Sequence, residues 1–222
     1  MQELERNSRV TQVEITREYN KNIGYFIIKR IIDIIGALCG IILMSPAMII
    51  VGIWIKLDSK GPIIFAQNRI GQDSKEFEMY KFRSMCMGAE CQLDKLQKNN
   101  EMTGPMFKIK EDPRVTKIGR FIRKTSIDEL PQLFNILKGE MALVGPRPSL
   151  PKEVAQFTSL QKRRLIAKPG LTCYWQVRGR SEVGFEEWME MDVEYIGDRS
   201  TWVDIKLIFK TVGVLFGDEG AR

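Results

Sequence analysis

Residues 34–55 read IIGALCGIILMSPAMIIVGIWI and contain no charged side chain. About 20 apolar residues are needed to cross the hydrocarbon core of a bilayer, so this stretch is long enough to enter a membrane. It begins too deep in the chain for a cleaved signal peptide, and no small-residue cleavage site follows it. The stretch predicts a membrane anchor over residues 23–57, between an N-terminal extension, residues 1–22, and a membrane-associated domain, residues 58–222.

Ser45 and Pro46 lie in the middle of this apolar stretch. A proline inside a helix removes a backbone hydrogen bond and clashes with the preceding turn, which bends the helix. Lys29 and Arg30 precede the stretch and Lys56 follows it, so the charge bias assigns neither end to one side of the membrane. Two arrangements stay open on these residues alone: a kinked helix that spans the bilayer, and a re-entrant helix that bends at the Ser-Pro pair and returns.

The rest of the chain mixes short strand signals with longer helical ones. Alternation and turn residues predict strands over residues 63–71, 77–82 and 141–144, and helical spacing predicts helices over residues 88–101, 115–124, 126–138, 150–165, 185–196 and 201–216. We therefore predict a helix-rich α+β fold with a small β element and amphipathic helices at the membrane interface. For the last helix, core packing is the alternative to membrane contact.

Composition narrows the chemistry. The net charge of +6 and the pI of about 9.1 suit an anionic partner, which includes nucleic acid, anionic lipid and phosphate-bearing substrates. No zinc-finger spacing or RNA-recognition motif is present, and the aromatic residues do not alternate with cations, so nucleic acid is not expected. The chain has no histidine, and its four cysteines include no CxxC pair. A zinc site is therefore not expected, and we predict reduced cysteines in a cytosolic compartment.

Asp128 and Glu129 form the sharpest acidic pair. Ser126 and Glu129 have the spacing of a capping box, which predicts that both carboxylates lie in the first turn of the helix over residues 126–138. The helix dipole favours negative charge there. Acidic residues are common in first turns for this reason alone, so an ordinary helix start is the alternative to a catalytic pair.

Several cations could hold an anionic substrate near this pair. Arg120 and Arg123 share one face of the predicted helix and could clamp a diphosphate, although a solvated face or contact with anionic lipid would explain them too. Lys81 and Arg83 alternate along a predicted strand and would point to one face. Arg147 stands between two prolines, so a stiff loop presents it.

Carboxylates among cations suit phosphoryl chemistry. A carboxylate can hold a divalent cation that bridges to a phosphate, or it can attack phosphorus and form an acyl phosphate. Oxygen ligands in a chain without histidine favour Mg²⁺. The sequence therefore predicts Mg²⁺ as the cofactor.

Several blocks of the sequence, taken together and in order, resemble the bacterial sugar transferase family, the small monotopic polyprenyl-phosphate hexose-1-phosphate transferases. These blocks include MYKFRSM, residues 79–85, and the run from FKIKEDPRVTKIGRFIRK to KGEMALVGPRP, residues 107–148. The resemblance covers most of the chain from Arg30 to about Phe209. It departs at Arg178, where the family often has asparagine.

The resemblance implies a function and a topology. It implies a re-entrant helix-break-helix anchor with both ends cytoplasmic, on the inner membrane of a bacterium. It implies that a UDP-sugar donates sugar-1-phosphate to polyprenyl (undecaprenyl) phosphate, with release of UMP, as the first membrane step of surface glycan or exopolysaccharide assembly.

Site roles follow from the same resemblance. Asp128 would be the nucleophile that forms a covalent phospho-sugar intermediate and would hold Mg²⁺, with Glu129 as its partner. Positions matching substrate-binding residues of the family are Lys81, Arg147 and Asp204, and more weakly Arg120 and Arg123. The alternative from another class is a non-catalytic basic adaptor that binds anionic membrane lipid.

Overall fold

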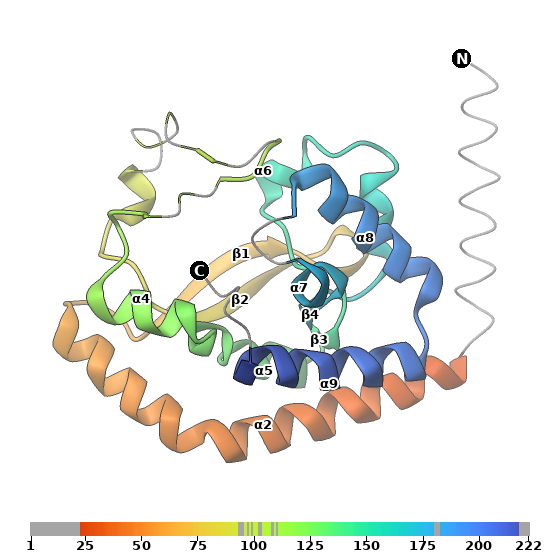
Figure 1. Ribbon diagram of the computed structural model, residues 1–222, viewed down its shortest axis with the longest axis horizontal. Coiled ribbons are helices and arrows are strands. Elements are labelled where there is room, and N and C mark those ends of the chain that lie inside the picture. Colours follow the sequence, from red (N-terminus) through yellow and green to blue (C-terminus); the bar gives the residue numbers. More distant parts are fainter. Residues whose placement is uncertain are drawn as a thin grey trace.

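The protein is described here from a computed structural model, in residues 23–92, 96, 98, 100–101, 104–107, 109, 111–179 and 183–217. The predicted N-terminal extension, residues 1–22, lies outside these residues, and so does part of the helix predicted over residues 88–101. One long bent helix runs along one side of the molecule, and the short helices and two small sheets pack on its concave side (Figure 1).

The long helix is α2, Ile23–Asp58. Its mean hydropathy reaches 2.5 over an 18-residue window, of which 11% is buried. Among the described residues it is the one helix long and apolar enough to cross a membrane, by length and composition. Its apolar side chains are exposed on the side away from the domain. Ile42 is 70% exposed and Leu43 is 75% exposed. A core helix would bury such residues, so this surface suits a lipid environment.

The predicted break at Ser45-Pro46 is a bend within a continuous helix. Pro46 lacks the N–H that would bond the Ile42 carbonyl one turn earlier. The Ser45 hydroxyl donates to that same carbonyl at 2.9 Å. Because the serine replaces the missing donor, the helix bends near its middle without unwinding (Figure 1).

Two small sheets form the β element. β1 (Ile64–Ile70) pairs antiparallel with β2 (Glu76–Phe82) across the 3₁₀ turn η1 (Gln72–Ser74), as the sequence predicted. β3 (Ala142–Val144) also confirms a predicted strand. It pairs in parallel with β4 (Gly170–Thr172), which the sequence did not predict.

The other helical elements are short. They are η2 (Ala89–Gln92), α4 (Lys117–Lys124), η4 (Ile127–Glu129), α5 (Gln132–Lys138), α6 (Pro151–Val154), η5 (Gln161–Ile166), α7 (Tyr174–Arg178), α8 (Phe185–Asp198) and α9 (Thr201–Gly217). The elements α4, α8 and α9 confirm predicted helices. The single helix predicted over residues 150–165 is wrong. Thr158 and Gln161 exchange side-chain and backbone hydrogen bonds at 2.9 and 3.3 Å, which starts a new turn there.

Each half of α2 packs on a different part of the domain. Ala37, in the first half, is buried with Leu133 and Ile136 of α5. Val51 and Ile55, in the second half, are buried with Phe82 of β2 and Ile122 of α4. The domain thus holds both arms of the bent helix, and the segment between α4 and α5 lies between these two contact regions (Figure 1).

Candidate active site

Asp128 and Glu129 lie on η4, in the segment that joins α4 to α5. The predicted capping box and the continuous helix over residues 126–138 are wrong. Ser126 has a φ of 56°, in the left-handed region, and its side chain makes no capping hydrogen bond. The Glu129 carboxylate turns instead to two cations from other elements. The dyad therefore stands on a tight 3₁₀ turn after a strained residue, an arrangement that is common at functional sites.

Glu129 is held by two ion pairs. Its Oε1 lies 2.7 Å from Lys81 Nζ of β2 and 3.0 Å from Arg147 NH1. Burial alone would raise the pKa of Glu129, but Arg147 and Lys81 outweigh it and hold that pKa far below its usual range. Glu129 is therefore ionised at neutral pH. It fixes the positions of two of the predicted phosphate-binding cations.

Asp128 is in a different state from its neighbour. Its side chain is buried, at 8% exposure. No residue of the described part of the chain donates a hydrogen bond to its carboxylate or lies in an ion pair with it. Burial raises its pKa, while Lys81, Arg123 and Arg147 act in the opposite direction. The carboxylate is thus surrounded by positive charge and keeps its oxygen lone pairs available.

Arg123 adds a third cation from the end of α4. Its Nε donates to the Ser84 hydroxyl at 2.8 Å, which fixes the guanidinium. Arg123 lies at an exposed position, but partial desolvation lowers its pKa and Asp128 raises it in part, so the two charges interact without direct contact. The predicted phosphate contact of Arg123 stays a prediction.

Arg147 reaches the dyad from the loop after β3. Gly145 N–H donates to the Thr172 carbonyl at 2.9 Å, and Gly170 N–H donates to the Pro146 carbonyl at 2.9 Å. A Cβ on Gly170 would lie 2.0 Å from Gly145 N, so the parallel strands approach this closely only because both residues are glycines. The unpredicted β3–β4 pair is therefore what anchors the loop.

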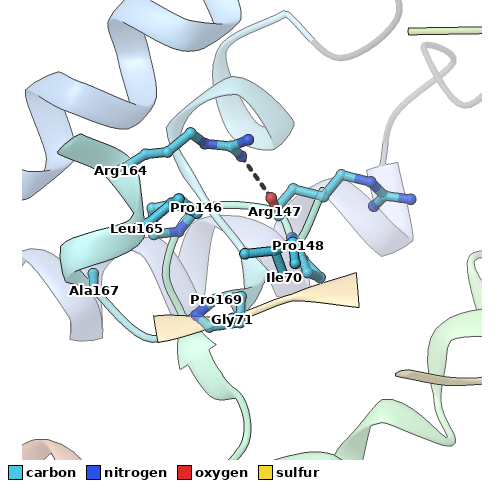
Figure 2. Close-up of a pocket in the computed structure, with 9 residues that line it drawn as sticks. All are labelled: Ile70, Gly71, Pro146, Arg147, Pro148, Arg164, Leu165, Ala167 and Pro169. Carbon is cyan, nitrogen blue, oxygen red and sulfur yellow. Dashed lines mark hydrogen bonds between the residues drawn. The ribbon is translucent and has the colours of Figure 1, made fainter. Parts of the chain in front are cut away.

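A shallow pocket lies behind this loop, lined by Ile70, Gly71, Pro146, Arg147, Pro148, Arg164, Leu165, Ala167 and Pro169. Figure 2 shows that the Arg147 side chain extends away from these lining residues, while the Arg164 guanidinium meets the Arg147 carbonyl. Arg164 also donates to the Ser149 hydroxyl and pairs with Asp192 at 2.6 Å. The pair is fully buried, and burial raises the pKa of Asp192 to about 6 despite Arg164. Arg164 therefore fixes the loop through its backbone carbonyl and the Ser149 hydroxyl.

Arg83 does not reach the dyad, which corrects the predicted phosphate contact. Its buried guanidinium donates to the carbonyls of Ser59, at 2.7 Å, and Lys60. These carbonyls lie at and just beyond the end of α2, where helical carbonyls lack partners. Arg83 thus caps the second arm of the anchor. Arg120 is exposed on α4, and its predicted substrate contact stays a prediction.

Asp204 also lies outside the dyad's surroundings. Its Oδ2 accepts hydrogen bonds from Tyr25 and Lys29 of α2, both at 2.9 Å, and its Oδ1 accepts one from Tyr195 at 2.8 Å. Both oxygens are therefore occupied by the fold. The structure assigns Asp204 to the contact between α2, α8 and α9, in place of the predicted substrate contact.

Sequence reasoning missed Arg69 and Arg164, which both donate to carbonyls of the Arg147 loop. The sequence did contain a hint for Arg69. It lies two residues after Gln67 on a predicted strand, so both polar side chains point to the same face. Arg164 gave no such signal, because the run Lys162-Arg163-Arg164 looks like an ordinary basic surface.

The predicted Mg²⁺ would need oxygen ligands near the dyad. The described residues contain no cluster of three acidic or cysteine side chains that could enclose a metal ion. Mg²⁺ usually keeps several waters and is held by one or two carboxylates together with substrate phosphates. Asp128, whose oxygens have no protein donor, fits that kind of site.

A sequence model of the bacterial sugar transferase family matches residues 24–218. The galactosyl transferase CpsE of Streptococcus agalactiae serotype III is 48% identical over 200 residues, which cover 90% of this chain and 44% of the relative. The undecaprenyl-phosphate galactose phosphotransferase of Salmonella typhimurium is 43% identical and is covered over 41% of its length. The exopolysaccharide production protein ExoY of Sinorhizobium fredii is 36% identical, with 83% of each chain covered.

The fold and the site thus define a domain packed on one long apolar helix, with an acidic dyad among cations. The chain belongs to the bacterial sugar transferase family. It spans less than half the length of the Streptococcus and Salmonella relatives.

Proposed function

We propose that this protein transfers sugar-1-phosphate from a UDP-sugar to undecaprenyl phosphate, as the first membrane step of surface glycan or exopolysaccharide assembly. One observation carries the proposal: a buried Asp128 carboxylate without a protein hydrogen-bond donor, beside cations that are held in place. The Salmonella relative is named for the same lipid phosphate, and an Escherichia coli relative, 39% identical, is named for transfer from UDP-glucose to it.

The first step is attack of an Asp128 oxygen on the phosphorus that carries the sugar. The bond from that phosphorus to the bridging oxygen breaks, and UMP leaves with the electron pair. An aspartyl phospho-sugar remains on the enzyme. A carboxylate is a competent nucleophile when it is ionised and desolvated, and the burial of Asp128 provides the desolvation.

The second step returns the enzyme to its starting state. An oxygen of polyprenyl phosphate attacks the same phosphorus, and the bond to Asp128 breaks. The product is a polyprenyl diphosphate sugar, and Asp128 is again a free carboxylate. Both steps pass through a phosphorus centre with extra negative charge, which Lys81 and Arg147 are positioned to offset.

Glu129 is expected to act through its partners. Its ionised carboxylate holds Lys81 and Arg147 on the side of Asp128, so these cations need no rearrangement during reaction. Asp128 would hold Mg²⁺ together with the substrate. When bound, the ion neutralises phosphate charge that would otherwise repel the attacking carboxylate.

The lipid substrate requires a membrane position. The exposed apolar convex side of α2, with Trp202 and Phe209 of α9, 71% and 73% exposed, supports burial in one leaflet. Both arms of α2 pack on the same domain, which supports a re-entrant anchor with both ends on the cytoplasmic face of the inner membrane. Labelling of single cysteines at both ends of α2 in intact cells tests this topology: protection from an impermeant reagent is expected at both.

The bend itself is tested by a double substitution. Pro46→Ala restores the backbone N–H that proline lacks, and Ser45→Ala removes the hydroxyl that replaces it. With both substitutions α2 should straighten and push one end toward the opposite face. Increased labelling of one end is the expected result. Unchanged protection at both ends would show that the pair does not set the topology.

The function is tested by UMP release from a panel of UDP-sugars, with purified full-length protein, polyprenyl phosphate and Mg²⁺. Release with one sugar, lost on chelation, is the expected result. The alternative, a basic adaptor that binds anionic lipid, predicts vesicle binding without any UMP. The accepted sugar would also give the substrate.

A further inference from the structure

Arg69 lies on β1, opposite Phe77 of β2. Its side chain is half-buried and held by three hydrogen bonds. Nε and NH2 donate to Gln67 Oε1 at 3.1 and 2.6 Å, and NH1 donates to the Pro148 carbonyl at 3.1 Å. The guanidinium is thus fixed at the base of the loop that presents Arg147.

The charge of Arg69 has no close counterion. Within the described part of the chain, no carboxylate lies within 4 Å of its guanidinium, and its three hydrogen bonds go to a carboxamide and a carbonyl. Burial and the nearby Arg147 lower the pKa of Arg69, which is about 10 although Glu153 and Glu129 act in the opposite direction. A partly buried guanidinium beside a second one is unfavourable unless an anion joins them.

Around the dyad as a whole, positive side chains also outnumber negative ones. Four cations interact with the dyad's surroundings, namely Lys81, Arg123, Arg147 and Arg69. Three carboxylates act on them, Asp128, Glu129 and Glu153, and Glu129 is already shared between Lys81 and Arg147. Asp112 also acts on Arg123, but its charge is paired with Arg114. The ionised site therefore carries excess positive charge, and a ligand with two adjacent phosphates would neutralise it.

We propose that Arg69 is a phosphate-binding residue of this site, and that it holds the diphosphate of the nucleotide-sugar together with Arg147. The inference rests on the proposed function for the identity of that substrate. Arg69 keeps two N–H groups beyond its three hydrogen bonds, and a guanidinium matches the geometry of two phosphate oxygens. The Gln67 carboxamide orients it without neutralising it, as a substrate contact requires.

Binding of inorganic diphosphate to the purified full chain tests the proposal without any catalysis. Arg69→Gln should weaken the affinity about 10- to 100-fold, because it removes a charge-assisted contact. Lys75→Gln is the matched control: it removes one positive charge from an exposed position in the turn of the same hairpin. Its affinity should stay within about twofold of the parent, since an exposed charge is screened.

A double-mutant cycle separates direct binding from support of the loop. If Arg69 contacts phosphate, Arg69→Gln weakens diphosphate binding in the Arg147→Gln background as well. If Arg69 only positions Arg147, the second substitution has no effect there, and the proposal is overturned. Should Arg69→Gln prove unstable in thermal melts, Arg69→Lys replaces it in the cycle, with a smaller loss expected.

The two proposals fail separately. A parent chain that binds diphosphate through Arg69 but releases no UMP from any UDP-sugar would contradict the proposed function and leave the phosphate site intact. A parent chain that releases UMP but shows equal diphosphate affinity with and without Arg69 would contradict the phosphate site alone.

Discussion

Two buried clusters of this protein each place an aspartate near a lysine, and they differ in how hydrogen bonds satisfy that aspartate. The dyad cluster contains Asp128 and Glu129 with Lys81 and Arg147. The anchor cluster contains Asp204 with Tyr25, Lys29 and Tyr195. Both aspartates are buried, at 8% and 2% exposure, beside a lysine from a distant part of the chain.

The difference is in how the fold satisfies each carboxylate. Asp204 accepts three hydrogen bonds, so its oxygens are committed to holding α2 against α8 and α9. Asp128 accepts none from the described residues, although cations surround it. Burial and positive neighbours therefore do not distinguish a reactive carboxylate from a structural one. The unused oxygen lone pairs do, because an attacking or metal-binding group must have them free.

The largest effect expected from this comparison is on activity. Asp128→Asn should reduce UMP release by about four orders of magnitude or more, because the amide cannot attack phosphorus. The folded-state pKa of Asp128 is raised, so its ionised form destabilises the fold at neutral pH, and the neutral amide should leave the melting temperature unchanged or higher. Activity assays and thermal melts on the same preparation measure both. A variant that loses stability along with activity would contradict the contrast with Asp204.

Asp204→Asn should reduce stability and leave activity intact, the reverse of Asp128→Asn. The substitution leaves the Lys29 ammonium partly buried without a counterion, at a cost of about 3–5 kcal/mol in the free energy of unfolding. Denaturant titration measures the loss. Asp198→Asn, at the exposed end of α8, is the control and should cost less than about 1 kcal/mol. Any remaining folded Asp204→Asn should retain UMP release.

Glu129→Gln should have a smaller cost that depends on pH. Its folded-state pKa is far below the ordinary value of 4.5, so its ion pairs stabilise the fold above pH 4.5, and that stabilisation is lost as the pH falls below it. At neutral pH the variant should lose about 2 kcal/mol. The comparison is best made in a chain that carries Asp128→Asn. The raised pKa of Asp128 would otherwise add a pH dependence of stability opposite to that of Glu129. In melts from pH 7 to pH 3, the difference in melting temperature between the two chains should begin to shrink below about pH 4.5, as part of the stabilisation is lost. Parallel curves would show that the pairs do not stabilise the fold.

The smallest effect is expected at the exposed pair of Arg178 and Glu194, 2.7 Å apart with both side chains 43% exposed. Solvent screens such pairs, so Arg178→Gln should change the free energy of unfolding by less than about 1 kcal/mol. Denaturant titration at low and high salt checks this. A loss as large as that of Asp204→Asn would show that ion pairing, rather than burial and hydrogen-bond satisfaction, determines the size of the change in the free energy of unfolding.

The spacing of apolar residues predicted the helices and strands that are long enough to show a repeat. Periodicity identified β1, β2, α4, α8 and α9, since each is long enough to display its repeat. It missed β4, a three-residue strand that exists only because β3 and two facing glycines allow it. It also began α5 too early, because the 3₁₀ turn η4 and Pro131 precede the helix, which starts at Gln132.

The candidate site was predictable to the same degree. The dyad and Arg147 were found because their neighbours in the chain, a helix start and two prolines, are informative. The roles of Arg83 and Asp204 depend on carbonyls and side chains that are remote in the chain. Charge identity alone cannot show whether a residue faces the substrate or an arm of the anchor helix.

Trapping of the intermediate tests the central claim most directly. The parent chain is mixed with its UDP-sugar and Mg²⁺ without polyprenyl phosphate, quenched, digested and mapped by mass spectrometry. We predict one equivalent of UMP and a sugar-phosphate adduct on Asp128, which disappears when polyprenyl phosphate is added. UMP release only in the presence of polyprenyl phosphate, or an adduct on another residue, would contradict the account.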